Sequence, residues 1–318
     1  MLSPVPTGPD RLMLLDSASL YFRAFFGVPD SVRAPDGTPV NAVRGFLDMV
    51  ATLVTAHRPT RMVACWDDDW RPEFRVAAIP SYKAHRLTAD GRTEDTPEGL
   101  EPQVPVLVDV LAALGVARIG CPGFEADDVI ATLAERAARA GTPVDVVTGD
   151  RDLFQLVDDA RSVRVLYTAA RGVRDIHVVD QAELASKYGV PDGHAYAAMA
   201  ALRGDPSDGL PGVPGIGEKT AAGLLARYGD LAGLRRAVDD GDRSIRGAQR
   251  ARLEAARGYL DVAPSVVNVR RDVPLGEVAD AIPGQPADLP RLAELAAHWG
   301  LASSVTRVTA ALAKAAPA

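Results

Sequence analysis

Nine carboxylates in this sequence occupy positions where acids can do chemistry, at the ends of expected strands, at the start of an expected helix or in a glycine-rich loop. No histidine or cysteine joins them, and an all-oxygen ligand set suits Mg²⁺ or Mn²⁺ rather than zinc. So many carboxylates would repel one another unless cations neutralised them. Two such ions a few ångströms apart promote phosphodiester hydrolysis. The predicted metal ligands are Asp16, Asp67, Glu125, Asp127, Asp128, Asp150, Asp152, Asp205 and Asp208.

Each part of this set has an ordinary structural interpretation when it is taken alone. The acids of 125–128 open an expected helix, and acids favour the first turn of a helix. Asp150 and Asp152 would point the same way from an extended chain, but such a pair is also common in turns. Asp205 and Asp208 lie in a Gly/Pro-rich loop, where aspartate supports turns. Only the combination of these groups favours a shared metal site.

Short apolar runs precede three of the acids and are typical of strands. Helical patterns over 40–57, 102–114 and 125–140 separate the runs, and this alternation predicts a parallel α/β sheet. Ligands bind beyond the carboxyl ends of the strands in such sheets, so the pattern predicts a site at that edge. The runs are Leu12–Leu15 before Asp16, Met62–Trp66 before Asp67, and Val144–Val147, which leads through Thr148 and Gly149 to Asp150.

The segment 210–221 is the most specific local motif, with the sequence LPGVPGIGEKTA. Gly215 and Gly217 bracket a tight turn before a helix, where missing side chains let a phosphate approach backbone amides and the positive end of the helix dipole. Lys219 and Thr220 follow on the same turn. We predict that these four residues hold DNA phosphates without reading bases. The alternative is an ordinary turn that caps a helix.

A polar stretch between Arg71 and Pro105 is long for a plain loop, and long loops are usually functional or disordered. If its first part is helical, Lys83 and Arg86 share one face. Tyr82 beside them offers a surface for base stacking. A solvated basic turn is the alternative for this segment. Arg23, in an aromatic segment behind Asp16, is a weaker candidate for a phosphate contact.

The composition sets limits on the class of protein. The chain has 318 residues, 47% of them hydrophobic, which is enough for a sizeable core. No apolar run is long enough for a transmembrane helix, and Cys65 and Cys121 form neither a disulfide framework nor a metal motif. We therefore expect a cytoplasmic protein without a membrane partner. The net charge of −7 argues against nucleic acid, but removing the nine acids leaves +2 for the rest.

In this order, the motifs resemble the bacterial and phage 5′-nuclease family, which is related to flap endonucleases and to the 5′-nuclease domain of bacterial DNA polymerase I. The resemblance implies a PIN-like parallel sheet flanked by helices over residues 1–187, with a helical arch at about 71–105. It also implies a helix–three-turn–helix DNA-binding and C-terminal helical region over 188–318. The matching segments are 15–17, 66–67, 74–75, 82–86, 125–128, 148–152 and 204–221.

The resemblance further implies roles for individual residues. Lys83 and Arg86 match arch cations that hold the scissile phosphate, and the hairpin of this family often holds K⁺ on its turn carbonyls. The catalytic residues would be these two cations with Asp16, Asp150 and Asp208. Asp16, Asp67, Glu125 and Asp127 match one metal group, Asp150, Asp152 and Asp208 match a second, and Asp128 and Asp205 match acids that act through water.

The activity implied is metal-dependent, structure-selective hydrolysis of DNA at 5′ flaps and 5′ ends, in replication and repair, by a monomer that binds flaps, nicks or gaps. An RNA–DNA flap is a further candidate substrate. Asp67 and Asp68 remain alternatives as ligands, because Trp66–Asp69 offers three acids where the family uses one. Three other functions remain open: a non-cutting DNA-binding module, a PIN-group ribonuclease, and a small-molecule phosphatase. The first would lack carboxylates, PIN-group ribonucleases lack the hairpin, and a phosphatase would have no use for the hairpin or the arch cations.

Overall fold

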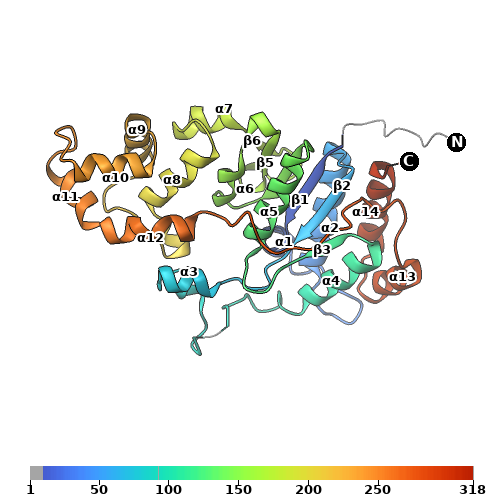
Figure 1. Cartoon of the computed structure of the whole chain (residues 1–318). Coiled ribbons are helices and arrows are strands. Elements are labelled where there is room, and N and C mark those ends of the chain that lie inside the picture. Colours follow the sequence, from blue (N-terminus) through green and yellow to red (C-terminus); the bar gives the residue numbers. More distant parts are fainter. Residues whose placement is uncertain (1–9, 92, 318) are drawn as a thin grey trace.

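The computed structural model describes residues 10–91 and 93–317. Six strands form one sheet in the order β3-β2-β1-β4-β5-β6, in which only β5 and β6 pair antiparallel (Figure 1). The predicted α/β sheet with parallel central strands is therefore confirmed. The strands are β1 (Leu12–Asp16), β2 (Arg61–Cys65), β3 (Ala117–Ile119), β4 (Val144–Thr148), β5 (Val163–Tyr167) and β6 (His177–Val179).

Helices cover both faces of the sheet, because alternate residues of each buried strand point to opposite sides. Leu12 and Leu14 of β1 pack in one core beneath α5 (Ala126–Arg139), whereas Met13 and Leu15 pack in a second core on the other face. The helices of this second face are α1 (Ser17–Gly27), α2 (Asn41–His57), α4 (Gln103–Leu114), α13 (Leu289–His298) and α14 (Ala302–Ala315). The predicted helices over 40–57, 102–114 and 125–140 correspond to α2, α4 and α5.

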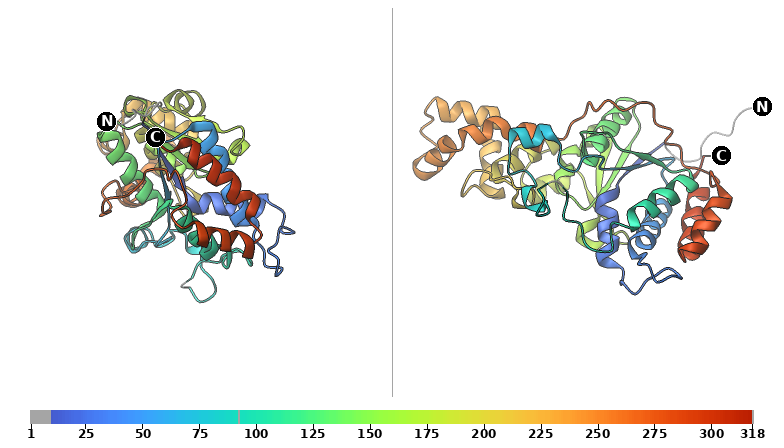
Figure 2. Two further views of the ribbon diagram at one scale, coloured as in Figure 1. Left: turned by 90° about the vertical axis from the view of Figure 1, so that its right-hand side faces the viewer. Right: turned by 90° about the horizontal axis from the view of Figure 1, so that it is seen from below.

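A set of helices extends from the β6 side of the sheet and forms one end of the molecule, whereas α13 and α14 lie at the other end (Figure 2). A strap, residues 268–288, joins the two ends and crosses α5 on its way back to the sheet. Its backbone is held there by Asp128, Thr132 and Arg136 of α5. The extending helices are α8 (Gly193–Arg203), α9 (Glu218–Tyr228), α10 (Leu231–Asp239), α11 (Gly247–Ala255) and α12 (Arg257–Val267).

The predicted arch segment contains less helix than expected. Within its described residues, 71–91 and 93–105, only α3 (Glu73–Ala78) and the single 3-10 turn η1 (Ala84–Arg86) precede the start of α4. Prolines and glycines interrupt the rest, and proline removes a backbone donor that a helix interior needs. Lys83 has a left-handed backbone, φ 47°, so it lies before η1 and not on a shared helical face with Arg86.

The remaining elements are short. In the part of the chain that the structure describes, no helix is long and apolar enough to cross a membrane. The short elements are α6 (Thr168–Arg171), α7 (Gln181–Glu183), the π-helix η4 (Leu184–Tyr188), and the 3-10 turns η2 (Asp152–Leu156), η3 (Asp159–Arg161) and η5 (Pro206–Asp208).

Candidate active site

Asp16 lies at the carboxyl end of the central strand β1 and is held from two sides. Its Oδ1 accepts a hydrogen bond from the backbone N–H of Ser19, 3.1 Å, and so caps α1. Its Oδ2 accepts one from the hydroxyl of Thr148, 2.6 Å, at the end of the neighbouring strand β4. The same hydroxyl accepts a bond from the backbone N–H of Asp150, 2.8 Å. Thr148 therefore fixes two predicted site acids relative to each other.

Asp67 follows β2 and reaches the start of α5. Its Oδ1 accepts a hydrogen bond from the backbone N–H of Ala126, 2.8 Å. Ala126 is the residue between Glu125 and Asp127, so the Asp67 carboxylate lies next to both acids. Asp68 turns away instead, with its Oδ1 3.8 Å from the guanidinium of Arg118 on β3. The geometry therefore favours Asp67 over Asp68 as a member of the site.

Asp150 and Asp152 occupy the turn that follows β4. The backbone N–H of Asp152 donates to Asp150 Oδ1, 2.8 Å, so the two residues form one compact turn. Asp205 and Asp208 belong to the loop after α8, where Asp205 caps η5 by accepting from Ser207. Asp150 and Asp152 interact electrostatically with each other and with Asp205 and Asp208, and Asp150 also interacts with Asp16 and Asp127. Two groups of acids thus meet at Asp150.

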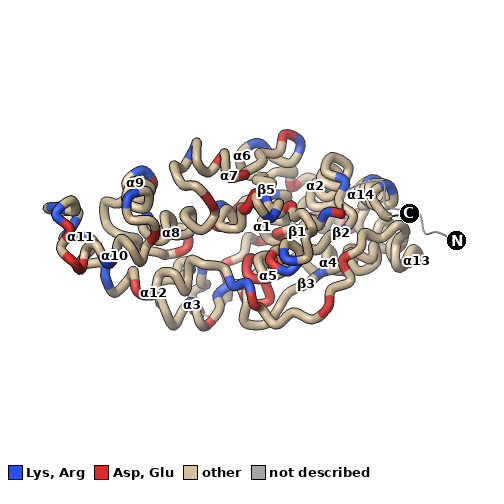
Figure 3. Tube along the Cα trace, turned by 45° about the horizontal axis from the view of Figure 1, so that its top comes forward, with Lys and Arg blue, Asp and Glu red and all other residues tan. Residues whose placement is uncertain are grey.

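The pKa values of this acid cluster are raised. Burial, and then repulsion by Asp67 and Asp150, raises the pKa of Asp16 to about 7 against the hydrogen bonds it accepts. Burial also raises the pKa of Glu125 to about 7, although Lys83 and Arg75 oppose it. The pKa values of Asp127 and Asp152 rise well above the usual range by burial and by neighbouring carboxylates. Figure 3 shows the acids gathered around α5 and the end of β1.

Asp150 shares this behaviour although its side chain is reached by solvent. The walls of the cluster still desolvate it and, with Asp208 and Asp205, raise its pKa. A set of acids that are costly to ionise together needs external positive charge before all of them can be anions.

Two carboxylates of the cluster have no protein donor. Within residues 10–91 and 93–317, the side chains of Asp127 and Asp152 accept no hydrogen bond. Such oxygens, next to other hard oxygen donors, fit divalent cations of the Mg²⁺ class by chemistry. Among the same described residues, however, no three His, Cys, Asp or Glu side chains form a ready-made metal site. The chemistry of the donors fits such a cation, although their side chains are not gathered around one point.

Two cations of the arch segment reach into the acid cluster. Lys83 Nζ lies 3.1 Å from Glu125 Oε1, and Arg86 Nη2 lies 2.7 Å from Asp208 Oδ1. Burial alone would lower the pKa of Lys83, but Glu125, Asp208 and Asp67 raise it well above its usual value, so Lys83 is a cation. The prediction that Lys83 and Arg86 lie together at the site agrees with these contacts, although no shared helix brings them there.

Tyr82 does not offer a surface for base stacking. Its ring is buried, 3% exposed, and its hydroxyl donates to both oxygens of Glu125 at 2.9 and 3.0 Å. The base-stacking prediction for Tyr82 was therefore wrong. The residue instead orients Glu125, and the cause is that 79–82 folds back onto α8 and α12 as a small apolar core.

Asp128 is occupied by a structural ion pair. Its two oxygens accept from the Nη1 and Nη2 of Arg75, both at 2.7 Å, and Oδ1 also accepts from the backbone N–H of Arg270, 2.8 Å. Both side chains are fully buried, 2% and 0% exposed. No oxygen of Asp128 is left for a metal or a bridging water, so this residue leaves the set of candidate ligands.

The glycine hairpin predicted to hold phosphates precedes α9. Gly215 has a left-handed backbone, φ 74°, and Lys219 and Thr220 are exposed on the first turn of the helix. Arg252 of α11 lies directly over Gly215, at the place that a side chain there would occupy. Sequence reasoning missed Arg252, because nothing in its local sequence links it to a turn so far upstream. Arg23 is half-buried on α1 with its guanidinium beside Gly172, and it forms no hydrogen bond or ion pair with an acid of the cluster among the residues that the structure describes.

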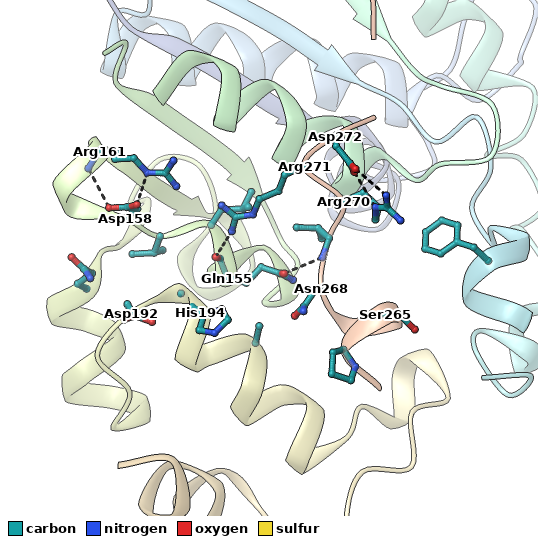
Figure 4. Close-up of a pocket in the computed structure, with 18 residues that line it drawn as sticks. Gln155, Asp158, Arg161, Asp192, His194, Ser265, Asn268, Arg270, Arg271 and Asp272 are labelled. Atoms are coloured by element: carbon teal, nitrogen blue, oxygen red, sulfur yellow. Dashed lines mark hydrogen bonds and ion pairs between the residues drawn. The ribbon is translucent and has the colours of Figure 1, made fainter. Parts of the chain in front are cut away.

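A cavity of about 880 Å³ lies beside the cluster but does not contain it (Figure 4). It is enclosed by η2, the start of α8 and the first part of the strap. Its three arginines are already paired, Arg161 with Asp158, Arg270 with Asp272 and Arg271 with Glu135. The chemistry described above therefore belongs to the edge of the sheet and not to this cavity.

Comparison with known proteins places the chain in a family. Residues 11–189 match the family model of the 5′-3′ exonuclease N-terminal resolvase-like domain, and residues 192–289 match the 5′-3′ exonuclease C-terminal SAM fold. The chain belongs to the 5′-3′ exonuclease family. This finding confirms the family, the fold class and the enzyme class that the motifs indicated.

Relatives from two bacteria carry the family name. A 5′-3′ exonuclease of Streptomyces coelicolor is 60% identical over 304 residues, which cover 94% of this chain and 99% of that protein. A 5′-3′ exonuclease of Mycobacterium tuberculosis is 52% identical over 312 residues, with 95% and 97% covered. DNA polymerase I of Mycobacterium bovis is 42% identical over 278 residues, 87% of this chain but 29% of the polymerase.

Two solved structures share the fold at low identity. A phage T5 flap endonuclease, in a complex with DNA and metal ions, superposes with a TM-score of 0.64 at 18% identity, and 96% and 98% of the two chains are covered. The catalytic core of Rad2 with DNA substrate gives a TM-score of 0.57 at 18% identity, with 94% and 92% covered. These likenesses establish the fold.

Proposed function

We propose that this member of the 5′-3′ exonuclease family is a divalent-metal-dependent enzyme that hydrolyses DNA phosphodiester bonds at 5′ flaps and 5′ ends. The observation that carries the proposal is the acid cluster itself. It combines carboxylates without protein donors, such as Asp127 and Asp152, with two cations that enter it from the arch segment. A purely structural set of acids would be paired throughout, as Asp128 is.

Mg²⁺ or Mn²⁺, as two or more ions, fits this donor set. When bound, such ions neutralise the acids, polarise the phosphate and lower the pKa of water. The residues proposed to hold them are Asp16, Asp67, Glu125, Asp127, Asp150, Asp152, Asp205 and Asp208.

Lys83 and Arg86 act on the substrate in this proposal. Their present partners, Glu125 and Asp208, are the acids that bound cations would neutralise, so both side chains would be released to the scissile phosphate. The side chain of Arg86 is 35% exposed and so is accessible to a ligand from solvent. Positive groups fixed beside a reacting phosphate stabilise the charge that develops on its oxygens.

The hairpin before α9 would hold the backbone of duplex DNA through Gly215, Gly217, Lys219 and Thr220. Arg252, exposed and without an ion pair among the described residues, extends this surface from α11. The turn carbonyls are the proposed site of K⁺. Contacts of this kind position a duplex without reading its sequence, which suits an enzyme that selects the structure of its substrate.

The rest of the proposal concerns organisation and setting. We divide the chain into a nuclease core, 1–187, and a DNA-binding and helical region, 188–318, and take the protein to act as a cytoplasmic monomer in replication and repair. Nicked or gapped duplexes and RNA–DNA flaps are candidate substrates beside DNA flaps. α13 and α14 of the second region pack on α4 and α2 and share the apolar core on that side of the first region.

The test uses a 5′-labelled flap duplex with Mg²⁺ or Mn²⁺, with and without EDTA. The protein should release the flap near the junction only with metal, and Asp208→Asn should lower the rate at least about 100-fold, because a charge that acts in the transition state is lost. Asp240→Asn is the matched control, an exposed aspartate at the end of α10. Tight binding without cleavage in either metal would favour a non-cutting DNA-binding protein.

A further inference from the structure

Glu218 lies at the start of α9, directly after the glycine hairpin, but its side chain faces away from the exposed surface of that turn. Its Oε1 accepts hydrogen bonds from two arginines, Arg151 Nη2 and Arg203 Nη1, the latter at 2.8 Å. The next residues on the same turn, Lys219 and Thr220, are exposed. The first turn of α9 therefore presents one face to the proposed DNA surface and one carboxylate to the protein.

Arg151 lies between Asp150 and Asp152 in the turn that carries these acids. Besides Glu218, its guanidinium donates from Nε to the hydroxyl of Tyr196, 3.2 Å, and lies 5.0 Å from the ring centre of Tyr188. The side chain is thus held from several directions. Because its backbone is the link between two site acids, holding the side chain constrains the turn itself.

Arg203 ends α8 and precedes the loop of the other two acids. Its Nη2 lies 3.7 Å from Asp205 Oδ2, and its Nε donates to the carbonyl of Gly204, 3.0 Å. One carboxylate, that of Glu218, therefore joins both loops that supply the second group of acids. The hydroxyl of Tyr196 also contacts both arginines, but Glu218 is the one carboxylate among the described residues that forms an ion pair with each of them.

We propose that Glu218 is a positioning residue that couples the docking of duplex DNA on the hairpin to the arrangement of the acids on the loops of Arg151 and Arg203. The inference rests on the proposed nuclease function and adds a route by which a correct substrate completes its own site. Binding of a duplex at the turn before α9 shifts Glu218, and the two arginines that it holds move together with their loops.

The network acts on position more than on stability. Its side chains are 38%, 37% and 17% exposed for Glu218, Arg151 and Arg203, and ion pairs this accessible contribute about 0 to 1 kcal/mol to stability. The Glu218→Gln protein should therefore fold, because glutamine has nearly the same size as glutamate and the side chain loses only the charge that holds both arginines. A stability measurement by urea denaturation checks this first.

The test compares two flap substrates, one with a downstream duplex long enough to reach the hairpin and one too short to reach it. In single turnover, the wild-type protein should cleave the long substrate faster than the short one, and this ratio of rates is the gain. Glu218→Gln should reduce the gain about tenfold, a usual size for coupling between two sites. Binding of the long substrate with Ca²⁺ in place of Mg²⁺ should stay within about twofold, because the DNA-contacting residues are untouched.

Asp261→Asn is the matched control, since Asp261 of α12 pairs with Arg235 of α10 in the same helical region but touches neither acid loop. This variant should keep the full gain. The double variant Glu218→Gln with Arg151→Gln should cleave no more slowly than the slower single variant, because both changes break one network.

Three results would overturn the inference: an unchanged gain in Glu218→Gln, an equal loss on short and long substrates, or additive effects in the double variant. Inactivity of the wild-type protein on every flap would instead refute the proposed function. The two failures are therefore distinguishable.

Discussion

Lys83 Nζ lies 3.1 Å from Glu125 Oε1, so a cation of the arch segment fills part of the acid cluster. Lys83 takes the place that a bound cation would have, because it neutralises a carboxylate that lies among several unpaired ones. Arg86 does the same for Asp208. The cluster is thus partly neutralised by the protein's own side chains, and these are the groups proposed to hold the substrate phosphate.

Removal of this cation tests its role. We expect Lys83→Met to lower the single-turnover rate by at least about 100-fold, because a fixed charge beside the reacting phosphate is lost. Substrate affinity with Ca²⁺ should fall by less than about tenfold, since the hairpin still binds the duplex. Lys187→Met, an exposed lysine on η4, is the control and should be fully active. Equal losses of rate and affinity would assign Lys83 to binding alone.

Gly217 offers a test of DNA binding by the hairpin in a variant whose folding should be unchanged. A Cβ added there would meet no atom within 4 Å, and its backbone, φ −90°, is open to any residue. Gly217→Ala should therefore fold normally but bind flap DNA about five- to tenfold more weakly, about 1 kcal/mol, because the methyl group keeps a phosphate from the amides.

The matched control is Gly223→Ala on the exposed face of the same helix, where a Cβ also meets nothing. It should bind DNA normally and gain up to about 1 kcal/mol of stability from the higher helix propensity of alanine. Filter binding at two salt concentrations measures both variants. Unchanged affinity in Gly217→Ala would remove the hairpin from the DNA surface.

Asp127 and Asp128 are neighbours with opposite roles, and substitution separates them. Asp128→Asn breaks a buried pair with Arg75 and should lower the free energy of unfolding by about 3 to 5 kcal/mol. Asp127→Asn removes a carboxylate that no donor compensates, so it should leave stability unchanged or higher but abolish cleavage. Urea denaturation in EDTA and the flap assay measure the two effects. Loss of stability in Asp127→Asn would contradict this assignment.

The raised pKa values predict how metal-free stability depends on pH. Asp16 and Glu125 each titrate at about 7 in the folded protein, above their unfolded values, so the folded state holds protons that the unfolded state has lost. Stability without metal should therefore fall as the pH rises from about 4 to about 7, on the order of 1 to 3 kcal/mol for Asp16 alone. Thermal unfolding in EDTA measures it.

The variant Asp16→Asn gives the control for this pH effect, because it cannot titrate and should flatten the curve. Divalent metal should have the reverse effect in the wild-type protein, since it binds the deprotonated acids and so stabilises the fold more at high pH. If the stability of the wild-type protein in EDTA instead rises between pH 4 and 7, the pKa values of these acids are not raised in the folded state.

The sequence was informative wherever a local pattern fixed a position. Apolar runs that end at Asp16 and Asp67 define β1 and β2, and the periodicity of 125–140 defines α5, because burial of one face sets the spacing along the chain. The site edge followed from the parallel sheet. Long-range partners could not be read in this way: Arg75 meets Asp128 and Tyr82 meets Glu125 only after the arch segment folds onto α5.

The failures have a common physical cause. Local sequence gives no measure of which acids will find an arginine, so Asp128 resembled its neighbours until its partner was seen. The helical arch was likewise an inference from resemblance, and the prolines of this segment interrupt it. The importance of Thr148, which spaces Asp16 and Asp150, also depends on two strands that lie side by side only in the folded sheet.

The packing of α14 on α2 has a consequence for synthesis of the protein. Val305, Val308 and Leu312 complete a core whose other members, among them Leu53 and Val54, belong to the first part of the chain. A ribosome delivers α2 long before α14, so the side of α2 that α14 covers stays exposed while the residues of the acid cluster are being made. The nascent chain therefore exposes an apolar surface of α2 during most of its translation, and a chaperone that binds such surfaces can bind there.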